Sequence, residues 1–144
     1  MHLTSTLERA ARIAPDKPAL VTDDTEITYA ELKDAARRAA TVFIDRGVAP
    51  GEAVAVLTYN TPGFVIAAFG AWYAGAVLVP VNHKLAGPEI AFAVQQSGAR
   101  LGVAAGELAA TADGATDIPW LTTEAGHDGL DSFDDLLATA APIP

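Results

Sequence analysis

The sequence predicts an α/β domain of three layers, in which a mainly parallel sheet is flanked by helices on both faces. Residues 53–104 alternate between short apolar β-type runs and longer helical segments, the order of a βαβαβ unit. The runs at 53–58 and 77–81 lack polar alternation, as strands buried on both faces do. With 144 residues, 51% of them hydrophobic, the chain is large enough to bury one core.

The first segment predicts a helix followed by a hairpin. Apolar residues recur at helical spacing over residues 3–14, and the proline-containing turn at 15–18 ends that pattern. Short β-type runs at 19–22 and 26–28 then flank Asp23 and Asp24, which suit a turn.

The second helix has the clearest local signals. Thr28 and Glu31 have the spacing of a capping box, in which each side chain accepts a hydrogen bond from the other residue's amide. The helix should run to about Arg46, with Gly47 in the left-handed position that follows many helices. Its predicted buried stripe consists of Leu32, Ala36, Ala39 and Phe43.

The third predicted helix is apolar nearly all round. It should begin with Thr61 as N-cap and Pro62 in the first position, and end before Gly75. A helix of this composition must be packed on several sides. Residues 63–81 carry no charge, but internal glycines and a proline favour helix, turn and strand over a membrane span.

Helix-breaking glycine and proline residues and the spacing of apolar residues predict the remaining elements of the core. Pro88 lies in the first turn of a helix that Gly98 should end, and residues 100–104 form the next strand. Beyond it, 105–117 suits a loop or an irregular helix. A last strand at 118–121 and a short helix capped by Ser132 complete the prediction.

Charge is unevenly distributed along the chain. The net charge is −9, yet residues 105–144 contain no lysine or arginine. This composition provides no basic face for nucleic acid, and a solvated surface is the simplest interpretation. The acidic residues of that segment are Glu107, Asp113, Asp117, Glu124, Asp128, Asp131, Asp134 and Asp135.

Motifs that carry chemistry are absent from the sequence. There is no cysteine, no glycine-rich phosphate loop and no Gly-x-Ser-x-Gly elbow. His2, His83 and His127 lack the spacing of metal ligands, and Asp134–Asp135 suits a helix-end surface pair. We therefore assign neither catalytic nor metal-binding residues. Without a visible secretory signal, we expect a cytoplasmic protein without a transmembrane segment.

Lys84 is the one candidate binding residue. It follows the strand that ends at Val81, and loops at the carboxyl ends of parallel strands are where α/β folds bind ligands. It is the only basic residue between Arg46 and Arg100, so it could meet a phosphate. An ordinary surface lysine is the alternative.

Four segments, taken in order, resemble the opening of adenylate-forming (AMP-binding) enzymes. They are residues 27–32 (ITYAEL), 47–56 (GVAPGEAVAV), 74–82 (AGAVLVPVN) and 84–100. The third is similar to the superfamily's early Ala-Gly-Ala…Pro-Leu-Asn motif. The form PVNHKL is similar to acyl-CoA and aryl-CoA synthetases, whereas peptide-synthetase adenylation domains more often carry Asp where Asn82 stands.

The resemblance implies a two-step reaction with ATP, Mg²⁺ and CoA. A carboxylic acid and ATP give an acyl-adenylate and pyrophosphate, and the CoA thiol then displaces AMP. The family's phosphate loop, aromatic-Gly-x-Thr-Glu segment, ribose-binding Asp and C-terminal Lys do not occur in the 144 residues. In some aryl-CoA ligases an Arg at the position of Lys84 lies near CoA phosphates, which suggests the same contact here.

We therefore expect the N-terminal part of an AMP-binding domain, inactive alone and binding none of these cofactors. Its predicted parts are 1–52 (helix, hairpin, capped helix), 53–104 (βαβαβ core) and 105–144 (acidic, less regular). Expected partners are the remainder of the same polypeptide (an ATP-binding part and a lid domain), a carboxylic acid and, through uncovered apolar surface, a second copy. A non-catalytic binding or assembly module and a peptide-synthetase adenylation fragment are the alternatives.

Overall fold

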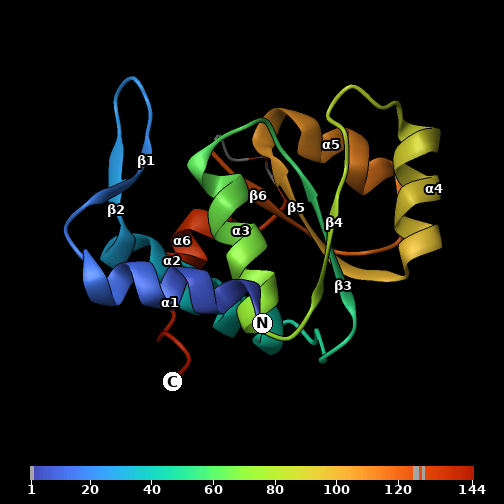
Figure 1. Cartoon of the computed structure of the whole chain (residues 1–144). Helices are drawn as coiled ribbons and strands as arrows, with labels where there is room; N and C mark the ends of the chain where they lie inside the picture. Colours follow the sequence, from blue (N-terminus) through green and yellow to red (C-terminus); the bar gives the residue numbers. More distant parts are fainter. Residues whose placement is uncertain (1, 125–126, 128) are drawn as a thin grey trace.

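The centre of the molecule is a parallel sheet with the strand order β4-β3-β5-β6 (Figure 1). The computed structural model describes residues 2–124, 127 and 129–144, so Asp128 lies outside the described residues. The strands are β3 (Ala53–Leu57), β4 (Val77–Pro80), β5 (Ala99–Ala105) and β6 (Trp120–Thr123). All three pairings are parallel, which confirms the predicted βαβαβ core.

Helices cover both faces of this sheet. On one face lie α2 (Tyr29–Asp45), α3 (Pro62–Tyr73) and α6 (Phe133–Thr139), which share a buried cluster with Val54, Val56 and Val103. On the other lie α4 (Gly87–Ser97) and α5 (Gly106–Ala115). The three-layer prediction is therefore confirmed. No helix among the described residues is long and apolar enough to cross a membrane.

The amino-terminal elements form a further cover outside α2 and α3. Helix α1 (Leu3–Ile13) places Leu7 against Leu32 and Ala36 of α2, with Phe69 and Tyr73 of α3 packed beside them. Strands β1 (Pro18–Val21) and β2 (Glu26–Thr28) pair antiparallel as the predicted hairpin.

Helix α2 has the structure that its sequence predicts. The Glu31 amide donates to Thr28 Oγ1 (3.2 Å) and the Thr28 amide donates to Glu31 Oε1 (3.0 Å), so both halves of the capping box are formed. Gly47 follows the helix with φ of +93°. Phe43 is fully buried and stacks on Phe133 of α6 with 5.7 Å between ring centroids.

Helix α3 is packed on several sides, as predicted, but its small residues rather than its large ones are buried. Ala67, Ala68, Gly70 and Ala71 are buried, whereas Phe64, Val65, Ile66, Phe69, Trp72 and Tyr73 are half-buried. A Cβ on Gly70 would lie only 2.5 Å from the Cβ of Ala39. Close approach of α3 to α2 therefore depends on that glycine.

Two sequence predictions differ from the structure. Strand β4 is an edge strand with Val77 52% exposed, not a strand buried on both faces, because the chain crosses from β4 over β3 to place β5 on the opposite side. Residues 106–115 form the regular helix α5, although 105–117 was expected to be a loop or irregular. Because α5 contains two glycines and lacks a side-chain cap, its sequence gives only a weak helical signal. Burial of Ala109 and Ala112 stabilises the helix.

The last residues of the chain lie along α2. Arg38 Nη1 donates to the Ala140 carbonyl (2.5 Å), Thr41 Oγ1 donates to the Ala141 carbonyl (2.5 Å), and the Ile143 amide donates to the Arg37 carbonyl (3.3 Å). Each bond joins positions about a hundred residues apart in the sequence.

Candidate functional site

The strand order creates a topological switch point at the carboxyl end of the sheet, between β3 and β5. From β3 the chain first adds β4 on one side, and it then adds β5 and β6 on the other. The connection that leaves the carboxyl end of β3 therefore leads to one side of the sheet, towards β4. The connection that leaves the carboxyl end of β5 leads to the other side, towards β6. Open parallel sheets bind ligands at such a switch point. The segments at this switch point are 58–60 after β3 and 106–107 after β5.

An aromatic pair and a carboxylate lie near this switch point. The half-buried ring of Tyr59 packs on the exposed His83 imidazole, with 4.7 Å between centroids and 57° between the planes. The nearby Glu107 carboxylate raises the pKa of Tyr59, and burial adds to the shift. At neutral pH Tyr59 is therefore an uncharged hydrogen-bond donor rather than a base.

Lys84 lies in the turn that follows β4. Its amide donates to Asn82 Oδ1 (2.9 Å), and the Leu85 amide donates to the Asn82 carbonyl (3.1 Å). Its side chain is exposed and forms none of the ion pairs found among the described residues. Lys84 thus lies in the exposed turn after the carboxyl end of β4, next to His83 in the sequence.

Sequence reasoning did not single out Tyr59 and Glu107. Tyr59 directly follows the strand predicted at 53–58, and Glu107 lies three residues beyond the end of the strand predicted at 100–104, so the rule that led to Lys84 applies to them equally. The sequence alone does not show that these two residues are neighbours, because the strand order decides which carboxyl ends lie side by side.

A separate cleft of about 630 Å³ opens between the hairpin tip and the carboxyl end of β6. One of its carboxylates, that of Asp134, stabilises the fold. Asp134 accepts from Thr123 Oγ1 (3.1 Å) and from the amide of Glu124 (3.0 Å), whose φ is +71°. One acid of the predicted surface pair therefore fixes the end of β6, while the Asp135 amide donates to the capping oxygen of Ser132 (3.1 Å).

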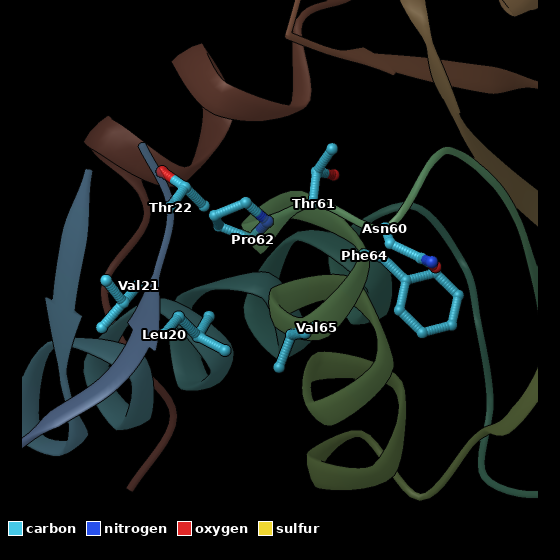
Figure 2. A pocket seen from close by; sticks show the side chains of 8 residues that line it. All are labelled: Leu20, Val21, Thr22, Asn60, Thr61, Pro62, Phe64 and Val65. Carbon is cyan, nitrogen blue, oxygen red and sulfur yellow. The ribbon is translucent and has the colours of Figure 1, made fainter. Parts of the chain in front are cut away.

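Beside this cleft is a smaller, mainly apolar pocket of about 220 Å³ (Figure 2). Leu20 and Val21 of β1 line it together with Phe64 and Val65 of α3. Thr61 also lines it, and the Thr61 hydroxyl is buried without a hydrogen-bond partner in the described structure.

Metal binding has no structural support within the described part of the chain. No group of three or more histidine or carboxylate side chains there could hold an ion. His83 packs on Tyr59 instead. The carboxyl ends of β3 and β4 therefore carry an aromatic pair, Tyr59 and His83, and the exposed cation of Lys84.

Comparison with known proteins gives consistent matches over nearly the whole chain. The model of the AMP-binding enzyme family matches residues 7–138. The chain is 34% identical over 140 residues to the long-chain-fatty-acid–CoA ligase FadD13 of Mycobacterium tuberculosis, covering 94% of this chain and 27% of the relative. It is 37% identical over 127 residues to a feruloyl-CoA synthase of Amycolatopsis, covering 88% and 26%.

Solved structures agree with these matches. A benzoate CoA ligase from Burkholderia xenovorans superposes with a TM-score of 0.90 and 28% identity, over 99% of this chain and 29% of that one. The N-terminal domain of FACL13 from Mycobacterium tuberculosis superposes with a TM-score of 0.85 and 30% identity, over 99% and 37%. This chain thus spans little more than a quarter of the curated relatives it matches.

Proposed function

The chain belongs to the AMP-binding enzyme family, and from this premise we propose that it forms the N-terminal α/β lobe of an ATP-dependent acyl-CoA synthetase. One observation carries the proposal: the whole lobe superposes on a benzoate CoA ligase with a TM-score of 0.90. The relatives matched by sequence carry the names of fatty-acyl and feruloyl CoA-thioester-forming enzymes, which supports the same reaction class.

The proposed reaction has two steps. A carboxylate attacks the α-phosphate of ATP and releases pyrophosphate, and the CoA thiol then attacks the acyl carbon and releases AMP. ATP with Mg²⁺ would be held by the remainder of the polypeptide, because the family's phosphate loop is not among these 144 residues. This lobe supplies the framework, and by itself it should turn over no substrate.

Within this framework Lys84 is the residue that would meet a phosphate of CoA. Two observations support this contact: the ammonium is exposed and forms no ion pair with another described residue, and loops at the carboxyl ends of parallel strands commonly bind ligands. A lysine supplies a point charge and lacks the forked donors of an arginine, so this contact neutralises charge without fixing orientation.

The direct test compares two polypeptides. The complete reading frame that contains this chain and the 144-residue chain alone would each receive ATP, Mg²⁺, CoA and a panel of aliphatic and aromatic acids. We expect the complete product to release pyrophosphate and form an acyl-CoA, and the 144-residue chain to do neither. Omission of CoA should abolish the thioester but leave ATP–pyrophosphate exchange.

Other outcomes would redirect the assignment. Turnover by the 144-residue chain alone would contradict its role as a framework. A complete reading frame without a phosphate loop and without turnover would favour a non-catalytic binding or assembly module. Transfer of the activated acid to a carrier-protein thiol rather than to CoA would favour a peptide-synthetase adenylation domain.

A further inference from the structure

The turn after β4 is fixed in its backbone at both ends. At its start the Val81 amide donates to the Val56 carbonyl of β3 (2.9 Å), and the Val81 side chain is buried. At its end the Ala86 amide donates to Oε1 of Glu89 (3.1 Å), a residue in the first turn of α4. Between these points the turn rests on two local bonds accepted by Asn82.

Side-chain support for the exposed middle of the turn comes from Tyr59. Asn82, His83 and Lys84 are all exposed, and the aromatic contact of this stretch is that between His83 and Tyr59. Tyr59 itself is anchored, because only Thr58 separates it from β3, which lies between β4 and β5 in the sheet, and because its side chain is half-buried. The contact therefore connects the turn to the rigid sheet.

We propose that Tyr59 is a positioning residue for Lys84: its ring, packed on His83, holds the turn that carries the lysine at the carboxyl end of β4, beside the carboxyl end of β3. This inference rests on the proposed function, in which Lys84 meets a CoA phosphate. The ring supplies the support rather than the hydroxyl, so phenylalanine should replace Tyr59 and alanine should not. His83→Ala should have the same effect as Tyr59→Ala, since either change removes the pair.

The first arm of the test uses the 144-residue chain and needs no activity. Hydrogen exchange of the Lys84 amide, followed by NMR, reports opening of the bond to Asn82 Oδ1. We expect exchange about tenfold faster in Tyr59→Ala and His83→Ala, and unchanged within about twofold in Tyr59→Phe. Amides of β3 and β5 serve as the internal control and should not change. An unaltered Lys84 amide in Tyr59→Ala would overturn the proposal.

The second arm uses the complete reading frame. Lys84→Ala and Tyr59→Ala should each raise the KM for CoA about tenfold, with kcat and the KM for ATP unchanged, whereas Tyr59→Phe should match the unaltered enzyme. If Lys84→Ala leaves the KM for CoA unchanged, the phosphate contact of the proposed function fails. If Lys84→Ala raises it and Tyr59→Ala does not, the positioning role fails while the proposed function stands.

Discussion

Helices α2 and α3 pack against each other and against the same face of the sheet, but they use opposite designs. Helix α2 buries its large Phe43 and turns charged residues to solvent, whereas α3 buries Ala67, Gly70 and Ala71 and leaves its aromatic residues half-buried. The first is stabilised mainly by side-chain burial, the second by close backbone approach. The difference shows that apolar composition alone does not indicate which side chains stabilise a helix.

The largest expected effect is the loss of a deep aromatic from α2. Phe43→Ala should destabilise the chain by about 3–5 kcal/mol, since a fully buried ring is removed from its stack on Phe133. Phe69→Ala in α3 should cost no more than about half of that, because the ring is half-buried and packs edge-on to Trp72. Urea unfolding gives both values, and equal losses would remove the contrast between the helices.

The next effect tests close approach on the α3 side. Gly70→Ala should cost about 1–3 kcal/mol, because the new methyl group would meet Ala39 at 2.5 Å and the Ala36 carbonyl at 3.3 Å. The matched control is Gly114→Ala in α5, where the added carbon would meet no described atom within 4 Å apart from its chain neighbours and the backbone of its own helix. That change should be neutral or stabilise by up to about 1 kcal/mol, the usual gain in helix propensity. A neutral Gly70→Ala would show that the helices can separate freely.

The two N-caps provide a smaller but sharper comparison. Thr28→Ala should cost about 1 kcal/mol, since it removes the oxygen that accepts from Glu31. Thr61→Val should be neutral or slightly stabilising, because the Thr61 hydroxyl is buried without a partner although the residue occupies the N-cap of α3. Thermal unfolding of both variants measures this, and a large loss at Thr61 would reveal a partner for its hydroxyl.

The smallest effect links both helices to α1 through one carboxylate. Glu8 lies 2.9 Å from the Lys33 ammonium of α2 and accepts from the Tyr73 hydroxyl of α3 (2.7 Å). Lys33 above all, against the opposing effect of burial, lowers the pKa of Glu8 below its usual range. A folded-state pKa below the unfolded value stabilises at higher pH, and that stability is lost as the pH falls through the folded value.

Glu8→Gln should therefore reduce stability at neutral pH and flatten its decline in acid below about pH 4.5, the usual glutamate range. Because the pair is partly exposed, the change should stay below about 1 kcal/mol. Denaturation midpoints at pH 3 and pH 7 would show it. An identical pH slope in both proteins would indicate that the contact adds nothing.

Local signals made α2 fully predictable, whereas context decided the rest. The capping box, the apolar stripe and Gly47 specify α2 within its own sequence. The edge position of β4 follows from a crossover, which no local sequence pattern encodes. Helix α5 lacks a side-chain cap, and packing of its buried alanines stabilises it instead. Similarly, Lys84 could be selected as the only cation of its region, but the pairing of Tyr59 with His83 joins the ends of two different strands.

The hydrogen bonds between the chain's last residues and α2 bear on the timing of folding during synthesis. Thr41 and Arg38 cannot acquire their acceptors at Ala141 and Ala140 until about a hundred further residues have left the ribosome. At a translation rate of about 5–20 residues per second, this takes roughly 5–20 s. During that interval this side of α2 stays uncovered on the nascent chain, where ribosome-associated chaperones can reach it.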